Sequence, residues 1–454
     1  MRIAIIGGGL GGLTAARALV AAGHDAHVLE AGPRVGGVVG TSTVAGFVRE
    51  HAASSFLGGP ANGAYALCSE LGIPVDKASP RAKKRFIYLD GKLRALPASP
   101  IALVRSDLLT WRGKLDLLKE PFRPSRPSGD ESVHAFAARR FGPEAARAMF
   151  APLVTGIYAA DAHDISLEAG FPRLAEFDAA GGVVRSLANM VGRGIARKLR
   201  GQPRAASTPR GLYAPTGGVG AIVDALAREL GARIHTGRTV TNIEPDERGV
   251  RVDGEVWDAA VLAIPAQDAA VMVGGIPALA SRLGSFHRAP AAVLYLGYPE
   301  AAVPKAVEGF GFLTALGEDL RVLGVVFESV VWPTRAPAGQ VLLRCICGGG
   351  RDPGAFALDD ATLLAQAQAD IAKVLGVTGA PSHASVVRWS RGVAQYGVGH
   401  NDLVREASAT ARTHRIVLAG ADYRGPGLND LCADALLIVD EVRGWASAPV
   451  SAAR

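Results

Sequence analysis

Three glycines near the start of the chain have the spacing that brings a main chain against a phosphate group. Gly7, Gly9 and Gly12 form a G-x-G-x-x-G pattern between the apolar run 3–6 and the Ala- and Leu-rich segment 13–22. A strand followed by a glycine turn and a helix presents unpaired helical N–H groups to a pyrophosphate. The pattern therefore predicts a dinucleotide site at the beginning of this helix.

An acidic residue and a second glycine pair follow at the positions such a site requires. Glu30 ends a predicted strand at 26–29, where its carboxylate can accept hydrogen bonds from both ribose hydroxyls. Arg34, Gly36 and Gly37 then form R-x-G-G, which supplies a cation and a second close approach of the main chain. The two elements together predict a nucleotide held from two sides.

A third glycine turn lies near the other end of the chain. Gly425 and Gly427 follow a predicted strand at 416–419 and precede a helix expected to run from about Asn429. The N-terminus of that helix could face the phosphates or the ring system of the same ligand. Alone this turn is a weak signal, but with Arg34-x-Gly36-Gly37 it predicts a second clamp.

Composition restricts the class of protein. A chain of 454 residues is too long to form a single hydrophobic core, so two or three domains are expected. Its composition, 49% hydrophobic and 20% charged residues, is typical of a globular protein. The four cysteines form no C-x-x-C, so we expect buried reduced thiols, no metal site and a cytoplasmic protein. No uninterrupted apolar run reaches about 18 residues, and no signal peptide is expected.

Positive charge is concentrated in two segments of a chain whose net charge is +7. Residues 179–223 contain seven Lys or Arg and no acid, and residues 81–126 contain twelve against four acids. These segments lack interleaved aromatic residues, which argues against nucleic acid. Two interpretations remain, namely solvated loops and contact with anionic lipid.

The order of patterns along the chain predicts elements that position these motifs. A hairpin is expected at 85–96, turned by Asp90-Gly91, followed by helices from 99 to about 199 that a Pro/Ser-rich loop at 120–132 interrupts. A flexible linker is expected at 201–211. Glycine-opened helix and short-strand patterns return at 212–265, and 266–410 is mixed.

The chain resembles the bacterial protoporphyrinogen oxidases of the amine oxidase and protoporphyrinogen oxidase superfamily over nearly its full length. The glycine motifs are shared across the superfamily, whereas the Arg85 hairpin, GIYA, GFGFL and W-x-x-G-x-x-Q-Y-x-x-G-H are specific to these oxidases. The matching segments are GGGLGGL at 7–13, RVGGVVGT at 34–41, KRFIYLDGKLRALP at 84–97, TGIYAADAHDIS at 155–166, TGGVGAIVDALA at 216–227, GFGFL at 309–313, RWSRGVAQYGVGH at 388–400 and YRGPGLND at 423–430.

The resemblance implies an α/β fold, α+β in part, in which a Rossmann-like FAD-binding domain is built from separated segments. A mixed-sheet substrate domain and an inserted α-helical, membrane-associating domain complete it. The implied division is 1–78, 206–265 and 411–454 for FAD binding, 79–97 and 266–410 for substrate, and 98–205 for the helices.

The resemblance also implies a cofactor and a set of residues that contact it. Non-covalent FAD is expected, because no covalent-flavin motif is recognisable. The expected FAD contacts are Gly7, Gly9, Gly11, Gly12, Glu30, Ala31, Arg34, Gly36, Gly37, Val38, Val240, Trp389, Gly420, Gly427, Leu428 and Asn429.

The implied reaction is the six-electron oxidation of protoporphyrinogen IX to protoporphyrin IX in heme biosynthesis. Three hydride transfers to FAD are expected, with molecular oxygen reduced to hydrogen peroxide, and no side chain is assigned a certain catalytic role. By carry-over, Arg85 would hold a propionate, Leu313 and Ile346 would sandwich the macrocycle, and the backbone at Gly156 would lie near the pyrrole N–H groups. Without the resemblance, Arg85 could be a solvated charge, and the two apolar residues could be ordinary core.

Other functions remain open at this point. Oxidation of coproporphyrinogen III shares the same macrocycle and differs in the number of carboxylates, and a flavin amine oxidase is a more distant alternative. A non-catalytic flavoprotein would leave the substrate-site matches unexplained. The partners implied are the membrane, bound peripherally at its inner face, ferrochelatase as recipient of the product, and a second copy in a homodimer.

Three departures from the family pattern accompany the resemblance. The family stretch E-x-G-P-N-S-F is here Glu50-His51-Ala52-Ala53-Ser54-Ser55-Phe56, without its glycine and proline. Ala160 replaces the second glycine of G-I-Y-A-G-D, and Ala394 replaces the proline before Gln395-Tyr396. We expect the fold to tolerate these small changes. His51 and His400 have no partner visible in the sequence and are expected to be structural.

Overall fold

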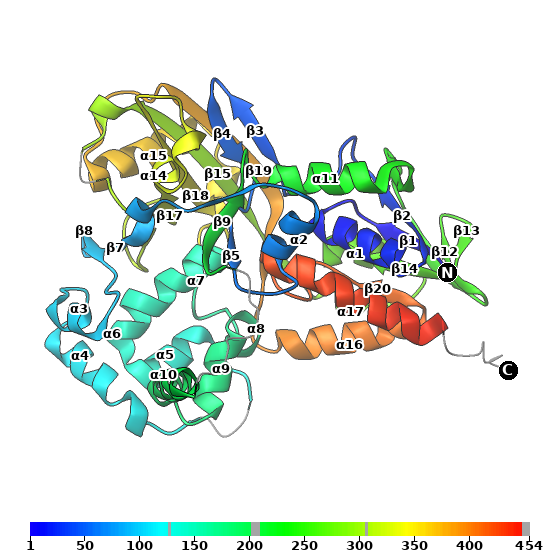
Figure 1. The fold of residues 1–454 in the computed structure, drawn as a ribbon, viewed down its shortest axis with the longest axis horizontal. Helices are drawn as coiled ribbons and strands as arrows, with labels where there is room; N and C mark the ends of the chain where they lie inside the picture. Colours follow the sequence, from blue (N-terminus) through cyan, green and yellow to red (C-terminus); the bar gives the residue numbers. More distant parts are fainter. Residues whose placement is uncertain (126–128, 201–208, 305–306, 447–454) are drawn as a thin grey trace.

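The computed structural model describes residues 1–125, 129–200, 209–304 and 307–446. Figure 1 shows a parallel sheet with its helices on the right, a larger mixed sheet at the upper left and a lobe of helices at the lower left. Most of the linker expected at 201–211, and residues 126–128 of the Pro/Ser-rich loop, lie outside the described residues.

A five-stranded parallel sheet brings together three separate parts of the chain. Ile3 to Ile6 are buried and pair with Ala26–Leu29 on one side and Ala259–Leu262 on the other. Ile3 and Ile5 face one buried cluster, and Ala4 and Ile6 face another, which explains why residues 3–6 are all apolar. In spatial order the strands are β10 (Ile234–Thr236), β2 (Asp25–Glu30), β1 (Arg2–Ile6), β14 (Ala259–Leu262) and β20 (Ile416–Leu418).

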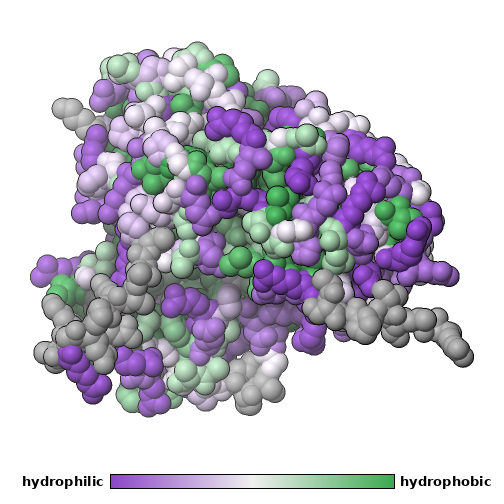
Figure 2. Space-filling model, turned by 45° about the vertical axis from the view of Figure 1, so that its right-hand side comes forward, coloured by the Kyte–Doolittle hydropathy of each residue, from purple (hydrophilic) through white to green (hydrophobic). Residues whose placement is uncertain are grey.

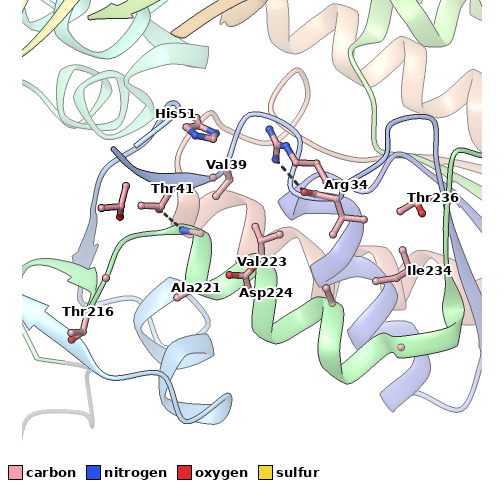
Figure 3. Close-up of a pocket in the computed structure, with 17 residues that line it drawn as sticks. Arg34, Val39, Thr41, His51, Thr216, Ala221, Val223, Asp224, Ile234 and Thr236 are labelled. Atoms are coloured by element: carbon pink, nitrogen blue, oxygen red, sulfur yellow. Dashed lines mark hydrogen bonds between the residues drawn. The ribbon is translucent and has the colours of Figure 1, made fainter. Parts of the chain in front are cut away.

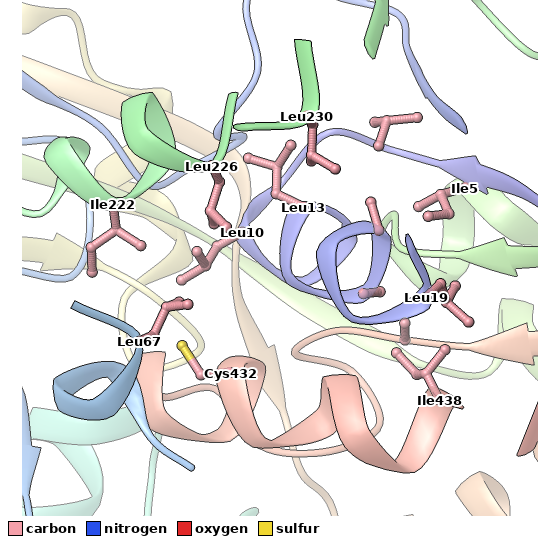
Figure 4. Close-up of a cluster of buried hydrophobic side chains, with 14 of the residues drawn as sticks. Ile5, Leu10, Leu13, Leu19, Leu67, Ile222, Leu226, Leu230, Cys432 and Ile438 are labelled. Atoms are coloured by element: carbon pink, nitrogen blue, oxygen red, sulfur yellow. The ribbon is translucent and has the colours of Figure 1, made fainter. Parts of the chain in front are cut away.

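Helix α1 (Leu10–Ala21) lies between α11 (Gly220–Leu230) and α17 (Leu428–Ala446) (Figure 4). Its buried leucines pack with side chains of both neighbouring helices, among them Leu226 of α11 and Ile438 of α17. The other face of the sheet packs on a second buried cluster, which includes residues of three helices. Those helices are α12 (Ala266–Met272), α13 (Pro277–Gly284) and α16 (His400–Thr413).

Three small antiparallel sheets adjoin this core. One is a meander, one is a two-stranded hairpin, and in the third the strand after the linker pairs with two strands from the N-terminal part, close to α2 (Ala64–Glu70). Their strands are β11 (Ile243–Asp246), β12 (Gly249–Val252) and β13 (Glu255–Trp257); β3 (Thr41–Val44) and β4 (Phe47–Glu50); and β5 (Phe56–Gly58), β9 (Gly211–Pro215) and β6 (Val75–Lys77).

The predicted hairpin joins a seven-stranded mixed sheet at its edge. Asp90 and Gly91 have φ of +51° and +72°, as a tight two-residue turn requires. One face of the sheet is covered by α15 (Asp360–Leu375), which buries Leu363 and Ile371. The strands in order are β19 (His383–Gln395), β15 (His287–Pro299), β18 (Gln340–Gly348), β17 (Gly324–Val326), β16 (Gly311–Thr314), β7 (Arg85–Leu89) and β8 (Lys92–Ala95); α14 (Glu328–Val331) follows β17.

The segment expected to be helical forms a lobe of its own. Its core is apolar and is crossed by a buried ion pair between Arg140 and Glu120, 2.7 Å apart, while Asp178 lies 3.1 Å from the same guanidinium. The helices are α3 (Pro100–Arg105), α4 (Trp111–Leu118), α5 (Val133–Phe141), α6 (Pro143–Ala145), α7 (Ala151–Tyr158), α8 (Leu167–Gly170), α9 (Pro172–Ala179) and α10 (Val183–Leu199), with a π-helical turn at Ala146–Phe150.

Several sequence expectations can be compared directly with this fold. All four cysteines are free and buried, as expected. In the part of the chain that the structure describes, no helix is long and apolar enough to cross a membrane, and no group of three potential metal ligands occurs. The space-filling view shows hydrophilic surface broken by small apolar areas, with a hollow where the helical lobe meets the rest (Figure 2).

Candidate active site

The turn after β1 explains the glycines at its two ends. Gly7 has φ +104°, and a Cβ on Gly12 would lie 2.0 Å from the carbonyl oxygen of Gly7, so glycine is required for α1 to approach the strand. At Gly9, by contrast, an added Cβ would meet no described atom within 4 Å. The middle glycine therefore borders open space, as the close approach of a pyrophosphate requires.

Helix α1 begins at this open space. Its N-cap is Gly9, which provides no side-chain hydrogen bond to the first turn, and that turn contains no acidic residue. The first N–H groups of a helix have no partner within it, and the helix dipole favours an anion there. The beginning of α1 thus has the properties of a phosphate site.

Glu30 links the glycine turn after β1 to the loop that follows β2. One carboxylate oxygen accepts the Gly8 N–H and the other accepts the Gly32 N–H, each at 2.7 Å. Each oxygen has a further lone pair, so the ribose contacts expected from the sequence stay compatible with this geometry. Ala31 beside it is exposed.

The R-x-G-G element packs directly against the glycine turn. Gly36 N–H donates to Gly8 O at 2.7 Å, and a Cβ on Gly37 would lie 3.3 Å from Gly9 Cα. Arg34 is exposed and donates only to the carbonyls of Val35 and Gly37, and no carboxylate pairs with it among the described residues. The two motifs predicted to clamp one ligand are therefore in contact.

The C-terminal turn lies on the other side of α1. A Cβ on Gly11 would be 3.5 Å from Gly420 Cα, and Gly420 itself has φ +105° and open space around its Cβ position. Gly427 N–H bonds to the Asp430 carboxylate at 3.0 Å, and Leu428 is buried at the start of α17. Segments more than 400 residues apart thus share one border of the candidate cofactor site.

Asn429 is engaged in holding the protein together. Its side-chain oxygen accepts the Ala64 N–H at 2.9 Å, which caps α2, and its amide nitrogen donates to Leu57 O at 2.8 Å. The sequence placed this residue at the cofactor, and these contacts give it a structural role beside the site.

A buried carboxylate supports the C-terminal turn. Asp434 lies 3.1 Å from Arg424, and its other oxygen is 3.4 Å from Gly420 N. Burial raises the pKa of Asp434 to about 6 even though Arg424 lowers it. The free energy of removing this carboxylate from water therefore exceeds what its cation returns.

A groove of about 660 Å³ lies on the α11 side of the R-x-G-G loop (Figure 3). Arg34, Val39 and His51 line it from one side and Val223 and Asp224 of α11 from the other. The groove shares Arg34 with the candidate cofactor site formed by the glycine turns, which we call the cradle. Its lining does not include Gly7, Gly9 or Gly12. Two further expected FAD contacts, Val38 and Val240, pack into the adjoining apolar clusters, Val240 being buried.

Trp389 and the two histidines have partners that the sequence did not reveal. Trp389 Nε1 donates to His51 O at 2.8 Å, and the His51 ring lies 3.2 Å from Ser42 Oγ. His400 stacks on Tyr396 with ring centroids 4.1 Å apart. Burial lowers the pKa of both histidines below the ordinary value, and Arg34 lowers that of His51 further, so both are neutral at pH 7.

The predicted macrocycle contacts lie in one row across the seven-stranded sheet. Leu313 of β16 pairs with Gly324 of β17, which pairs with Ile346 of β18. Paired residues point to the same face, so Leu313 and Ile346 share a face with a side-chain-free position between them. Both are half-buried.

Gly156 meets this row from the helical lobe. A Cβ on Gly156 of α7 would lie 3.0 Å from both terminal carbons of Leu313. The structure therefore brings together two residues that are more than 150 positions apart in the sequence and were assigned to one site by resemblance alone.

Arg85 begins β7 at the edge of the same face. It pairs in register with Gly311, one row from the apolar residues, and its guanidinium lies 5.0 Å from the centre of the Phe310 ring. The side chain is exposed, and no carboxylate pairs with it among the described residues. An unpaired guanidinium stacked on an aromatic ring is suited to an incoming carboxylate.

The alanine departures fit without backbone strain at the substituted position. The residue with left-handed backbone is Ala159, at φ +48°, whereas Ala160 is buried with ordinary φ. Gln395 donates to Tyr158 O at 2.9 Å, and Ala394 is buried nearby.

Arg351 donates to Thr314 O and Ala315 O, each at 2.6 Å, and burial lowers its pKa.

The sequence did not reveal a buried charged network behind the site. Glu50 accepts from Val219 N–H and from Arg335, and Arg335 also pairs with Glu328. The Tyr295 hydroxyl donates to Glu50 O at 2.8 Å. These residues join the nucleotide-binding and mixed-sheet regions, and no local spacing could have linked positions 50, 295 and 335.

Comparisons with known proteins agree with this geometry. Residues 10–428 match the flavin containing amine oxidoreductase family. The chain is 30% identical to human protoporphyrinogen oxidase, over 94% of this chain and 95% of that protein, and 27% identical to Bacillus subtilis coproporphyrinogen III oxidase, over 95% of both. The crystal structure of a candidate protoporphyrinogen oxidase from Exiguobacterium sp. superposes with a TM-score of 0.81 at 22% identity, covering 97% of this chain and 98% of that one.

The chain therefore belongs to the flavin containing amine oxidoreductase family. It is an FAD-dependent oxidoreductase with a mixed α/β fold, as the resemblance implied. The open space at Gly9, the uncapped beginning of α1 and the Glu30 carboxylate fit the pyrophosphate and ribose of FAD.

Proposed function

We propose that the protein oxidises protoporphyrinogen IX to protoporphyrin IX in heme biosynthesis. The observation that carries this proposal is the contact of Gly156 with Leu313, in the same apolar row as Ile346. A flat apolar surface with an unpaired arginine one row away suits an apolar macrocycle that carries carboxylates. The identity to human protoporphyrinogen oxidase supports the same assignment.

In this reaction the side chains bind and orient, and FAD supplies the hydride acceptor. Leu313 and Ile346 contact the macrocycle and exclude water, while Arg85 fixes one propionate by a charge-assisted hydrogen bond. Main-chain carbonyls near Gly156 accept from pyrrole N–H groups. Removal of six electrons from one substrate consumes three molecules of oxygen and yields three of hydrogen peroxide.

A second substrate candidate is coproporphyrinogen III, which the name of the Bacillus subtilis relative supports. The test is a parallel assay of both porphyrinogens, which follows porphyrin fluorescence and hydrogen peroxide with the flavin-loaded protein. Porphyrin formation faster than the uncatalysed rate, with three peroxides per porphyrin, is the expected result. Oxidation of neither substrate would overturn the proposal.

The three segments around the parallel sheet are proposed as the FAD-binding part, and the mixed sheet as the substrate part, with the ranges expected from the sequence. Residues 98–205 are proposed to contact the membrane. Among the described residues, twelve of the eighteen exposed large apolar side chains fall in this range, although it is less than a quarter of the chain. That enrichment supports a surface for lipid.

The exposed apolar residues of the lobe follow helical spacing. On α4 they are Trp111, Leu115 and Leu118, with Phe122 just beyond and 87% exposed. Arg112 and Lys119 are exposed beside them. An apolar stripe flanked by basic residues fits an interfacial helix on the cytoplasmic face of a membrane. Delivery of the product to ferrochelatase along that surface, and a homodimer, belong to the same proposal.

A further inference from the structure

Arg344 is a buried arginine that forms no ion pair with the described residues, although Glu50 and Glu328 act with it on the same buried tyrosine, Tyr295. It lies in the middle of β18 and is 9% exposed. Its described hydrogen bonds go to Ala52 O and, at 3.5 Å, to Ser54 Oγ, while its Nε has no partner. No carboxylate of the described residues lies within ion-pair distance of this guanidinium.

The neighbouring Arg335 shows how this protein stabilises a buried guanidinium elsewhere. Arg335 is 4% exposed and pairs with two carboxylates, Glu328 and Glu50, the latter at 2.7 Å. A buried charge without an ion pair is costly, and that cost is returned when an anion arrives. Binding of an anionic ligand to Arg344 would therefore offset the cost of burying its charge.

Sheet register places Arg344 on the face that carries the proposed macrocycle contacts. Arg344 pairs with Val326, Val326 with Gly311 and Gly311 with Arg85, so both arginines belong to one row on one face. The adjacent row, two residues further along each strand, is that of Leu313 and Ile346. Three strand spacings separate the two arginines, roughly 14 Å between Cα atoms.

The two contacts of Arg344 fall on positions where this chain departs from its family pattern. Ala52 and Ser54 stand where the pattern E-x-G-P-N-S-F has glycine and asparagine. Arg344 thus contacts a segment in which this chain departs from the family pattern, through the main-chain carbonyl of Ala52 and the hydroxyl of Ser54. It borders the site on the side opposite Arg85.

We propose that Arg344 binds a second carboxylate of the porphyrinogen and makes the site selective for a tetracarboxylate substrate. This inference rests on the proposed porphyrinogen oxidation and favours its second substrate candidate, coproporphyrinogen III, over the first. Coproporphyrinogen III carries a propionate on every pyrrole, so it can reach Arg85 and Arg344 together. Protoporphyrinogen IX has its two propionates on neighbouring pyrroles, so the opposite side presents vinyl groups and leaves Arg344 unpaired. A site that loses a buried polar partner discriminates strongly between such substrates.

The test compares Arg344→Met, which retains much of the side-chain volume, with Arg344→Lys, which retains the charge. Arg388→Met is the matched control, because Arg388 lies on the opposite face of the same sheet and pairs with Asp360 at 2.6 Å. For flavin-loaded Arg344→Met we expect the KM for coproporphyrinogen III to rise about 10-fold or more, with kcat within about twofold. The KM for protoporphyrinogen IX should change by less than about threefold, Arg344→Lys should be intermediate, and Arg388→Met should match the parent protein.

Equilibrium binding of the two product porphyrins gives a readout that is independent of turnover. Coproporphyrin III should bind the Arg344→Met variant at least about 10-fold more weakly, with protoporphyrin IX little affected. Equal losses for both porphyrins, together with a lower melting temperature, would show that Arg344 only holds the 52–54 segment and would overturn the inference. Unchanged constants for both would do the same. If the parent protein oxidises neither porphyrinogen, the proposed function itself fails.

Discussion

The proposed cofactor cradle, which comprises the three glycine turns, and the proposed substrate face of the mixed sheet are built by opposite means. The cradle consists of main chain brought together where side chains are missing, as at Gly9, Gly12 and Gly37. The proposed substrate face consists of side chains, among them Arg85, Leu313 and Arg344, held in rows by strands from distant parts of the chain. An added side chain in the cradle should therefore abolish flavin binding by steric exclusion. Changes on the substrate face should instead raise KM by amounts that depend on the residue and on the substrate.

The largest effect is expected where the cradle has least room. Gly12→Ala places a methyl group 2.0 Å from Gly7 O, so α1 must move away from β1, at a cost of about 3 kcal/mol or more. We expect a protein without bound flavin and with a lower unfolding temperature, measured by flavin absorbance and thermal denaturation. Gly444→Ala in α17 is the control, because its Cβ would meet no described atom within 4 Å. A Gly12→Ala protein that retains full flavin would contradict the steric account.

On the substrate face, Arg85→Ala should raise the KM for either porphyrinogen with much less change in kcat. Loss of one charge-assisted pair costs about 1.5–3 kcal/mol, or about 10-fold to 150-fold in KM. Arg81→Ala is the matched control from the same basic segment, where Arg81 lies 3.7 Å from Glu308 at the surface. If both variants leave KM unchanged in steady-state assays, Arg85 is a solvated charge.

A smaller, pH-dependent effect should distinguish the support of the cradle from the cradle itself. The pKa of Asp434 is raised to about 6 in the folded protein, so its contribution to stability is present below the unfolded value near 3.8 and is lost as pH rises through about 6. Asp434→Asn removes that loss. The unfolding free energy of the variant minus that of the parent protein should therefore increase by about 2 kcal/mol from pH 4 to pH 7. Urea titrations at each pH measure this difference, and a constant offset would contradict it.

The weakest effect concerns the lipid surface. Leu118→Glu should reduce co-sedimentation with anionic vesicles at low salt, since each nearby charge changes binding by about 1 kcal/mol. Val271→Glu, at a residue 79% exposed outside the lobe, is the control. Parent protein that stays in the supernatant with anionic vesicles at low salt would show that the basic segments are solvated loops.

The sequence predicted the glycine turns of the proposed cradle because their geometry is local, while their contacts with FAD stay predictions. Gly7 to Glu30 and Arg34 to Gly37 specify their geometry through main-chain conformation and short spacings, and the hairpin turn at Asp90-Gly91 is equally local. The placement of Gly156 and Leu313 in one site came from resemblance alone. The sequence did not reveal the side-chain hydrogen bonds of Asn429 to α2 and Leu57, and its expected cofactor contact stays a prediction. The pairing of Arg335 with Glu50, and the unpaired Arg344, depend on strand order and register, which no spacing along the chain encodes.

The parallel sheet can be completed only late in the synthesis of the chain. Its strand β1 needs β14 beside it, β14 needs β20, and Asn429 supplies the cap of α2. The first half of the cofactor motif leaves the ribosome more than 220 residues before β14 and more than 380 residues before β20, and the longer interval lasts about 20 to 80 s at 5–20 residues per second. During that time the side of α1 that packs on α17 has no native cover. The candidate cofactor site, which Gly420 borders beside Gly11, is therefore complete only after the C-terminal turn has been made.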